Sequence, residues 1–410
     1  MIHVCFCFSD KTGRYAKFAG TSALSLFENT NSDVTIHILH DKTLTNDNRD
    51  KFNYLAGRYS QTIKFYNVDE LVPNKIAEII KLVPEVEKAK VTVGTFYKVL
   101  IPQVLPAEIE KAIFIDPDTL VNLDINELWQ IDLEDKVLGA VREIDNGANP
   151  NKSFLLCSEG VVNPEDYFNT GVLLMNLNAL RGEEEKIMQG IKFRGENPKQ
   201  KFFEQTVLNY CFSARALTLP TKFNCFVKTE RQSGEQNLGR KIYHYTGGPS
   251  RMYLDMNDPA NHLWMNYFVK TPWFNEETVG RLYASLQKIS NDVRNSSLKF
   301  TSTLAGKTRA FFIEPKKIDA MKKTFSIGKD ELIISATNDA SFKKLLDTMK
   351  ASRGKCVAFI LTEKFLNKGF PFDTLKKAGF TEGRDFLKGW TFLPSAQNPP
   401  HSTYSLIESL

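Results

Sequence analysis

Short apolar runs alternate with amphipathic segments through the first 275 residues. Runs typical of buried strands lie at Ile2–Phe8, Val34–His40, Thr62–Val68, Lys111–Ile115, Val137–Val141 and Gly171–Leu177. Segments with helical spacing lie between or after them, at Gly20–Asn29, Asn46–Arg58, Ala179–Gly190 and Glu204–Phe212. Near-continuous apolar strands separated by helices are typical of a mostly parallel sheet that is covered on both faces. The pattern therefore predicts an α/β fold, in which ligands bind at the carboxyl ends of the strands.

A second α/β pattern follows a helix predicted at Glu276–Ile289 and a polar stretch at Ser290–Thr303. Its predicted strands are Glu331–Ala336, Cys356–Thr362 and Phe386–Pro394, and its predicted helices are Lys316–Thr324, Ala340–Ser352 and Asp373–Ala378. Residues Ser395–Leu410 form a loose tail in this interpretation. We expect a first domain over residues 1–275, a helical linker over 276–299 and a smaller α/β domain over 300–410, with the change of pattern near residue 295.

Charge is distributed unevenly along the 410 residues, whose net charge is +5. From Asn275 to the end, 22 Lys and Arg residues against 14 Asp and Glu residues give +8, which leaves −3 for residues 1–274. A basic C-terminal region favours peripheral contact with an anionic membrane or an acidic glycan, although an ordinary solvated surface has the same composition. No basic stripe carries interleaved aromatic residues, so we expect no nucleic-acid partner.

The cysteines and the apolar segments bear on the compartment. The six cysteines form no Cys-x-x-Cys pair, and the N-terminus lacks the basic residues and the long apolar run of a signal peptide. No stretch approaches the roughly 18 apolar residues of a membrane span. We therefore expect a cytoplasmic protein that contacts a membrane only peripherally, if at all.

Two carboxylates stand at the end of the predicted strand Lys111–Ile115. Asp116 and Asp118 flank Pro117, and side chains at this spacing can converge on one divalent cation. Oxygen ligands suit Mg²⁺ or Mn²⁺, and such a cation can neutralise a leaving diphosphate. The alternative is a plain strand-to-turn junction, in which Asp116 caps the turn and Pro117 fixes its backbone.

His244 ends another short predicted strand, and a Gly-Gly-Pro turn follows it closely. A histidine there can complete a metal site with two aspartates, although a lone histidine is more often structural. The backbone N–H of Gly247 can approach a phosphate closely, and Arg251 can pair with that phosphate.

Several motifs together, in their order and spacing, resemble glycosyltransferase family eight, a retaining group that includes glycogenin and bacterial lipopolysaccharide galactosyl- and glucosyltransferases. The resemblance extends over roughly residues 1–274, and residues 300–410 lie outside it. The segments that carry it are Phe8–Asp10, Thr95–Pro102, Lys111–Val121, Asn126–Trp129, Phe168–Asn176, Glu204-Gln205 and His244–Gly247.

The resemblance implies a GT-A fold, which is a Rossmann-like nucleotide-sugar-binding domain, and transfer of a hexose, glucose or galactose, from a UDP-sugar with retention of configuration. The acceptor would be a glycan or a lipid-linked hydroxyl in surface polysaccharide or lipopolysaccharide synthesis. The roles it implies for single residues are as follows: Asp116, Asp118 and His244 hold Mn²⁺ or Mg²⁺, Asp10 reads the base, Lys98, Gly247 and Arg251 lie at the diphosphate, and Asn169, Gln205 and Glu204 lie near the transferred sugar.

The chain departs from the family pattern at a few positions. Lys98 stands where the family usually has Arg and cannot form a bidentate fork, and Glu204 replaces an Asp. Gln205 is neutral and would be a poor covalent nucleophile, so we interpret it as an electrostatic or positioning group. The alternative is that Glu204 or Glu143 is a carboxylate near the anomeric carbon. Two other functions stay open: a non-catalytic nucleotide-sugar-binding protein and a sugar nucleotidyltransferase. The second is disfavoured because the loop Ser9–Arg14 has only one glycine.

Overall fold

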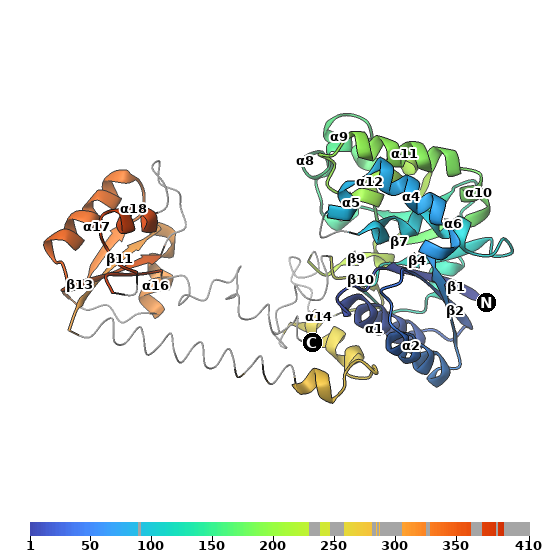
Figure 1. Cartoon of the computed structure of the whole chain (residues 1–410), viewed down its shortest axis with the longest axis horizontal. Coiled ribbons are helices and arrows are strands. Elements are labelled where there is room, and N and C mark those ends of the chain that lie inside the picture. The colour runs from blue at the N-terminus through green and yellow to red at the C-terminus, as the bar shows by residue number, and fades with distance from the viewer. Residues whose placement is uncertain are drawn as a thin grey trace. The chain divides into compact units, whose positions relative to one another are not determined.

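The chain forms two compact units, Met1–Thr278 and Val279–Leu410 (Figure 1). The computed structural model describes residues 1–88, 92–228, 238–246, 258–280, 284, 287, 306–324, 329–361, 371–382 and 384–388. Most of the predicted linker at 276–299, the predicted change of pattern near residue 295 and the tail at 395–410 lie outside the described residues. The domain limits predicted from the sequence therefore stay a prediction.

A seven-stranded sheet forms the centre of the first unit, in the order β3-β2-β1-β4-β7-β6-β8. Its strands are β1 (Ile2–Phe8), β2 (Val34–His40), β3 (Thr62–Asn67), β4 (Lys111–Ile115), β6 (Leu138–Arg142), β7 (Phe168–Asn176) and β8 (Ala216–Thr218). The pairs β1/β2, β2/β3, β1/β4 and β6/β8 are parallel, which confirms the predicted parallel-rich α/β sheet.

One strand of this sheet, β7, runs antiparallel to both of its neighbours, β4 and β6. The strand predicted at Gly171–Leu177 begins too late in the sequence, because β7 starts at Phe168 and includes Asn169 and Thr170. Ile115 at the carboxyl end of β4 pairs with Val172. The first residues of β7 consequently lie at the same sheet edge as the carboxyl ends of the parallel strands.

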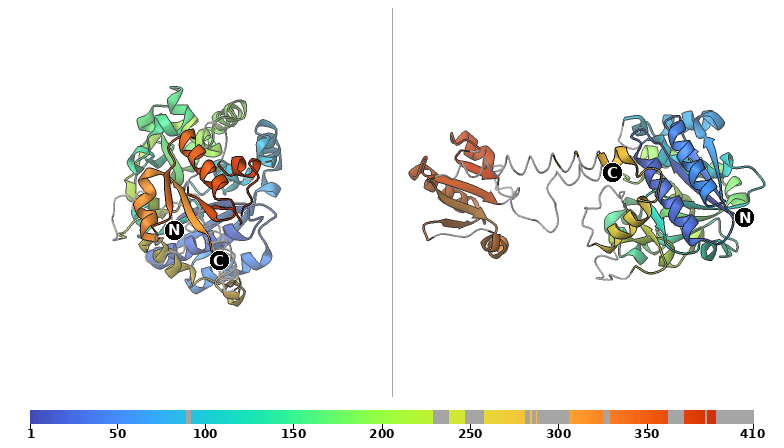
Figure 2. Two further views of the ribbon diagram at one scale, coloured as in Figure 1. Left: turned by 90° about the vertical axis from the view of Figure 1, so that its left-hand side faces the viewer. Right: turned by 90° about the horizontal axis from the view of Figure 1, so that it is seen from below.

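Helices cover both faces of the sheet. They are α1 (Arg14–Asn29), α2 (Asn46–Arg58), α3 (Val68–Leu71), α4 (Pro73–Leu82), α5 (Glu85–Lys88), α6 (Ile101–Val104), α7 (Asn126–Trp129), α8 (Pro150–Ser153), α9 (Leu155–Ser158), α10 (Leu177–Arg181), α11 (Glu184–Glu196), α12 (Phe203–Phe212) and α14 (Pro259–Phe268). Short 3₁₀ turns are η1 (Val93–Leu100), η2 (Ile144–Asn146), η3 (Pro164–Asp166), η4 (Ser213–Arg215) and η5 (Thr221–Phe223). Helices α1 and α2 lie on one face, and α4, α11 and α12 lie on the other (Figures 1 and 2).

Two helix predictions need correction. The helix predicted at Gly20–Asn29 begins earlier, at Arg14, because Asp10 accepts hydrogen bonds from backbone N–H groups in the first turn of α1. Gly20 therefore lies inside the helix and not at its start. A Cβ at Gly20 would lie 2.1 Å from the Trp273 ring, so this glycine permits close packing and does not end the helix. The single helix predicted at Ala179–Gly190 is two helices, α10 and α11, separated at Gly182.

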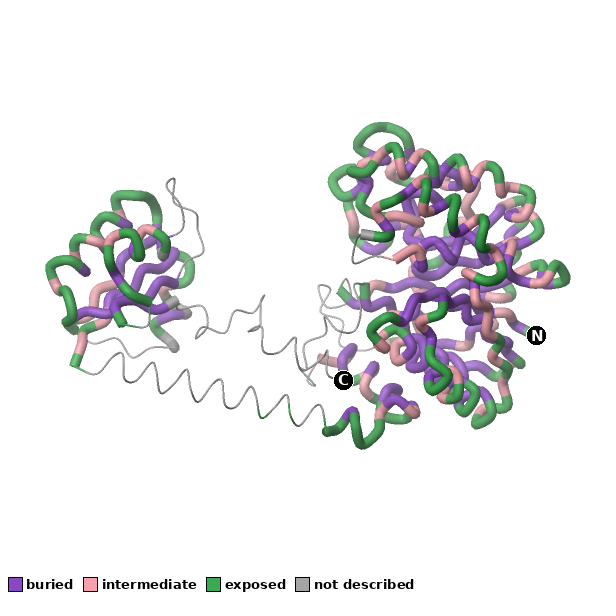
Figure 3. The backbone as a smooth tube through the Cα atoms, viewed as in Figure 1, coloured by how far each residue is buried: buried purple, intermediate pink, exposed green. Residues whose placement is uncertain are grey.

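The buried residues concentrate along the sheet, as the colouring of the backbone in Figure 3 shows. On the face under α4, α6, α10, α11 and α12, one large cluster of buried residues includes Cys7, Phe96, Phe114, Leu173 and Phe212. A separate three-stranded sheet, in the order β5-β10-β9, joins β5 (Thr119–Val121), β10 (Ile242–His244) and β9 (Cys225–Phe226). In this small sheet β10 pairs antiparallel with β5, which follows β4 closely along the chain.

The second unit contains a parallel sheet in the order β12-β11-β13-β14. Its elements are β11 (Thr308–Ile313), η7 (Pro315–Lys317), α16 (Ile318–Thr324), β12 (Leu332–Ser335), α17 (Asp339–Ala351), β13 (Cys356–Leu361), α18 (Pro371–Lys377) and β14 (Phe386–Lys388). The α/β prediction for this region is confirmed, but the sequence analysis missed the central strand β11. Successive β11 residues alternate between two cores, with Phe312 packed toward α17 and Phe311 on the opposite face.

Within the described residues, no helix is both long enough and apolar enough to cross a membrane.

Candidate metal centre and its polar network

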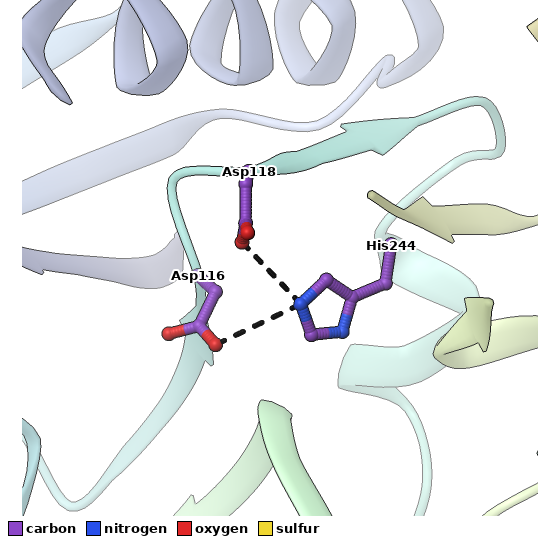
Figure 4. A group of neighbouring side chains, drawn as sticks. All are labelled: Asp116, Asp118 and His244. Atoms are coloured by element: carbon purple, nitrogen blue, oxygen red, sulfur yellow. Dashed lines mark ion pairs between the residues drawn. The ribbon is translucent and has the colours of Figure 1, made fainter. Parts of the chain in front are cut away.

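Asp116, Asp118 and His244 come together at the carboxyl edge of the large sheet (Figure 4). Asp116 directly follows β4, Asp118 directly precedes β5, and His244 is the last residue of β10. His244 Nε2 lies 3.3 Å from Asp118 Oδ1 and 3.9 Å from Asp116 Oδ2. One ligand atom from each residue lies within 4.8 Å of the other two, a grouping that could hold one metal ion.

Backbone hydrogen bonds fix this grouping from both sides. The Asp116 N–H donates to Gly171 O at 2.7 Å, which attaches the start of the turn to β7. The Tyr245 N–H donates to Asp118 O at 2.9 Å, which attaches the end of the turn to the residue after His244. The pairing of β10 with β5 brings His244 opposite Thr119. The small sheet therefore places His244 beside the two carboxylates, although it lies more than a hundred residues away in the sequence.

The ring of His244 lies against Gly171, a position where a side chain would not fit. A Cβ there would lie 2.2 Å from His244 Cε1, 2.6 Å from Nδ1 and 3.0 Å from Asn169 Oδ1. The glycine of the Asn-Thr-Gly segment is thus explained by the space that the imidazole fills. The two carboxylates and the imidazole that lies against Gly171 are a donor set that fits a divalent cation such as Mg²⁺ or Mn²⁺.

Lys98 is a buried cation behind Asp116. Its Nζ lies 3.1 Å from Asp116 Oδ1, 3.2 Å from Glu204 Oε1 and 3.1 Å from Thr170 O, so all three ammonium hydrogens have an acceptor. Burial alone would lower the pKa of Lys98, but the carboxylates of Asp116 and Glu204 outweigh it and raise that pKa. Glu204 also accepts a hydrogen bond from Thr95. Lys98 and Glu204 thus form a buried ion pair. The contact between Lys98 and a diphosphate stays a prediction.

The electrostatics of the three grouped side chains reflect their burial. Burial raises the pKa of Asp116, and the neighbouring Asp118 raises it further, while Lys98 and His244 oppose the shift. Burial lowers the pKa of His244, but Asp118 and Asp116 outweigh that effect and the net shift is upward. Two carboxylates with one neutral imidazole would leave this position negatively charged, which favours a cation.

A second set of polar groups lies beside the metal-ligand cluster and is almost fully buried. Asn169 Nδ2 donates to Glu143 Oε1 at 2.9 Å and lies 3.2 Å from Gln205 Oε1. Gln205 Nε2 donates to the same Glu143 oxygen at 3.2 Å and to the Tyr167 hydroxyl at 3.4 Å. Burial raises the pKa of Glu143, and the hydrogen bonds from Asn169 and Gln205 oppose that shift. The structure therefore brings Asn169 and Gln205 together and joins both to Glu143, and their predicted place near the transferred sugar stays a prediction.

Asn224 connects the two sets. Its Nδ2 donates to Asn169 Oδ1 at 2.8 Å, and its Oδ1 lies 3.0 Å from His244 Nδ1. Sequence reasoning missed this residue, because a single Asn between Phe223 and Cys225 carries no motif of its own. Its backbone is held by Asn146, whose Nδ2 donates to Asn224 O at 2.9 Å.

The remaining predicted residues differ in outcome. Asp10 follows β1 at the same sheet edge, but both of its carboxylate oxygens accept hydrogen bonds from the chain, Oδ1 from Tyr15 and Ala16 and Oδ2 from Asn48. Burial raises the pKa of Asp10 to about 6 against the effect of those hydrogen bonds. Its predicted contact with the base stays a prediction. Gly247 and Arg251 lie outside the described residues.

Comparison with known proteins gives consistent results. The sequence model described as "Glycosyl transferase family 8" matches residues 4–250. The lipopolysaccharide 1,2-glucosyltransferase of Escherichia coli is 27% identical over 278 residues, which are 64% of this chain and 77% of that protein. General stress protein A of Bacillus subtilis is 24% identical over 293 residues, 67% of this chain and 95% of that protein. A Haemophilus influenzae relative is 31% identical over 223 residues, 53% of this chain, and the match spans only 62% of that relative.

Among solved structures, the galactosyltransferase LgtC in complex with donor and acceptor sugar analogs superposes with a TM-score of 0.53 at 18% identity, over 68% of this chain and 99% of that one. At this identity the likeness concerns the fold, and the fold is that of GT-A glycosyltransferases.

Proposed function

Since the chain belongs to glycosyl transferase family 8, we propose that it transfers a hexose from a UDP-sugar to a hydroxyl of a glycan or lipid-linked acceptor, with retention of configuration. The observation that carries this proposal is the cluster of Asp116, Asp118 and His244 beside the Glu143, Asn169 and Gln205 set. The named activities of the Escherichia coli relative and of LgtC support glucose or galactose as the sugar and a surface glycan as the product.

In this proposal each group of side chains has one task. Asp116, Asp118 and His244 would hold Mn²⁺ or Mg²⁺, which when bound supplies positive charge to the diphosphate leaving group. Lys98 favours the ionised form of Asp116 through their 3.1 Å contact, against the effect of burial. Asn169 and Gln205 present amide groups to the transferred sugar. Their bonds to Glu143 fix the orientation of both amides before substrate binds.

The two candidate carboxylates near the anomeric carbon differ in their surroundings. Glu204 forms an ion pair with Lys98 and accepts a hydrogen bond from Thr95. Glu143 instead lies on the side of Asn169 and Gln205, with 5% of its surface exposed. We therefore favour Glu143 over Glu204 as the carboxylate that stabilises positive charge developing on the sugar.

A pocket next to Gln205 is our candidate for the acceptor. Its lining residues are Lys152, Ser153, Phe154, Leu155, Ser158, Tyr167, Gln200, Lys201, Phe202 and Thr206. The Tyr167 hydroxyl contacts Gln205, and the exposed ring of Phe202 packs against Phe154 at 5.3 Å between centroids. Exposed aromatic rings are a favourable surface for the apolar face of a sugar.

The proposal is tested by titrating the protein with UDP in a calorimeter, with and without Mn²⁺, using wild type and Asp118→Ala. We expect binding that requires Mn²⁺ and is lost in Asp118→Ala, because that variant removes one of three metal ligands. Hydrolysis of UDP-glucose and UDP-galactose then identifies the donor. Binding of UDP without hydrolysis of any UDP-sugar would favour the non-catalytic nucleotide-sugar-binding protein, and no UDP binding at all would contradict both.

The setting of the reaction is part of the proposal. We expect transfer in the cytoplasm, with the basic C-terminal region in peripheral contact with an anionic membrane where a lipid-linked acceptor is available.

A further inference from the structure

In the chain of hydrogen bonds that runs from Asn169 through Asn224 to the candidate metal ligand His244, only one assignment of donors and acceptors is consistent. The starting point is Asn169, whose Oδ1 accepts from the Gly171 backbone N–H at 2.8 Å. A backbone N–H can only donate, so the amide of Asn169 cannot be turned the other way. Its Nδ2 therefore faces the Glu143 carboxylate, which can only accept when ionised.

The direction then continues through Asn224. Because Asn169 presents an oxygen, the atom of Asn224 that lies 2.8 Å away must be its Nδ2 donor. The other end of the same amide, Oδ1, is the acceptor that lies 3.0 Å from His244 Nδ1. Asn224 is fully buried, so no water competes for these two contacts. His244 must therefore carry its proton on Nδ1.

We propose that Asn224 is a positioning residue which holds His244 in the Nδ1–H tautomer and turns the lone pair of Nε2 toward Asp116 and Asp118. This inference rests on the proposed function, since it gives the imidazole the form in which it binds a divalent cation. The two ends of the Asn224 amide thus have different partners. The oxygen accepts a hydrogen bond from His244, and the nitrogen donates one to Asn169, which is proposed to face the sugar.

Without Asn224 the proton has a competing position. Nε2 lies 3.3 Å from an oxygen of Asp118, so that carboxylate would draw the proton to Nε2 once Nδ1 has lost its acceptor. The Nε2–H form points a hydrogen at the metal position and cannot act as a ligand there. Loss of outer partners of this kind typically weakens metal binding by about 10- to 100-fold.

Two substitutions separate the two ends of the amide. Asn224→Leu removes both hydrogen bonds at similar volume. Asn224→Asp keeps an oxygen for His244 Nδ1 but places its second oxygen against Asn169 Oδ1. Asn209→Leu is the matched control, because Asn209 is equally buried and its hydrogen bonds go to the backbone of Phe168 and Gln205 and not to the His244 ring.

The full-length protein is titrated with Mn²⁺ in a calorimeter without nucleotide, and its ¹⁵N-histidine spectrum is recorded metal-free at pH 9, with His244→Gln assigning the resonance. We expect Asn224→Leu to bind Mn²⁺ about 10- to 100-fold more weakly than wild type and to show the Nε2–H form. Asn224→Asp and Asn209→Leu should retain both the affinity and the Nδ1–H form. In Asn224→Asp, hydrolysis of the UDP-sugar should fall because Asn169 is displaced.

The inference is overturned if wild-type His244 carries its proton on Nε2, if Asn224→Leu matches wild type in both measurements, or if Asn209→Leu weakens Mn²⁺ binding as strongly. Failure of wild type to bind Mn²⁺ or Mg²⁺ would contradict the proposed function instead. The ¹⁵N-histidine spectrum would still show whether Asn224 holds His244 in the Nδ1–H form.

Discussion

At the scale of single residues, the candidate site depends on what surrounds each functional group as much as on the group itself. Gly171 leaves room for the His244 ring, Lys98 neutralises buried carboxylates, and Asn224 orients an imidazole. None of these three is itself one of the grouped metal ligands. All three can be tested by substitutions that leave the three ligands in place: Asn224 by those given above, and Gly171 and Lys98 by those that follow.

Gly171→Ala places a methyl group where the His244 ring lies, 2.2 Å from Cε1. Because the ring must move away from Asp116 and Asp118, we expect Mn²⁺ affinity to fall at least about tenfold while the far-ultraviolet circular dichroism is unchanged. Gly139→Ala in the adjacent strand β6 is the control, since the atoms nearest to its Cβ would belong to the flexible Leu219 and Leu133 side chains, at 3.1 and 3.2 Å. Equal Mn²⁺ affinity in both variants would contradict the packing argument.

Lys98→Met replaces the buried cation by an apolar side chain of similar length. Asp116 and Glu204 are then left without a counter-charge, and breaking a buried pair in this way typically costs about 3–5 kcal/mol. We expect a loss of this size in the free energy of unfolding, measured with urea in the presence of EDTA. Adding Glu204→Gln should recover part of the loss because it removes one of the two carboxylates. A double variant less stable than Lys98→Met would contradict the proposed interaction.

At the scale of elements, the pairing of β1 with β2 brings two histidines next to each other, the half-buried His3 and the fully buried His37. His37 in β2 has no exposed surface, its Nε2 lies 3.0 Å from Nδ1 of His3 in β1, and its Nδ1 lies 3.1 Å from the Tyr66 hydroxyl in β3. Burial, together with the smaller effects of His3 and Lys64, lowers the pKa of His37 from its ordinary value of 6.5 to about 3. The native strands therefore hold His37 neutral.

This arrangement predicts a pH dependence of stability. Between pH 6.5 and about 3 the unfolded chain binds a proton at His37 that the native chain does not bind, so the free energy of unfolding falls as the pH is lowered. Each such proton contributes a slope of up to about 1.4 kcal/mol per pH unit. Urea unfolding at pH 7.5, 6 and 5 measures it, and His37→Phe should show a shallower slope than wild type. Parallel curves for the two proteins would show that His37 is not the cause.

At the scale of the whole molecule, the two units have separate cores. Among the described residues, the buried cluster around Phe96 and Phe114 in the first unit shares no residue with the clusters around Phe312 and Phe311 in the second. The second unit also lies outside the match to the family, which ends at residue 250. Its contribution is therefore expected to be separable from donor binding.

A chain that ends at residue 299 tests this separation. We expect it to retain Mn²⁺-dependent UDP binding and donor hydrolysis, because the grouped ligands all lie in the first unit. We also expect weaker co-sedimentation with phosphatidylglycerol vesicles than the full chain, since the removed region carries most of the basic excess, and equal binding to neutral vesicles. Vesicle binding that does not change on truncation would exclude the membrane role proposed for this region.

Much of the architecture follows from local sequence. Near-continuous apolar strands such as β1, β2 and β4 are recognisable because a buried parallel strand excludes polar residues on both faces. The pair Asp116 and Asp118 is recognisable because both residues belong to one short turn after such a strand. The strand β11 was missed even though it is central, and the start of α1 was missed because Gly20 usually weakens a helix. The ring of Trp273, a distant residue, decides that this glycine is tolerated.

The sequence by itself thus determined the α/β class, the two aspartates at a strand end and His244 as a candidate third ligand. Only the tertiary structure decided that β7 is antiparallel, which brings Asn169 to the edge where β4 ends, and that Lys98 is committed to Asp116 and Glu204. It also decided that Asn224 joins His244 to Asn169. The physical reason is that strand ends and turns are encoded by neighbouring residues, whereas the direction of a buried hydrogen bond depends on groups that meet only after the chain has folded.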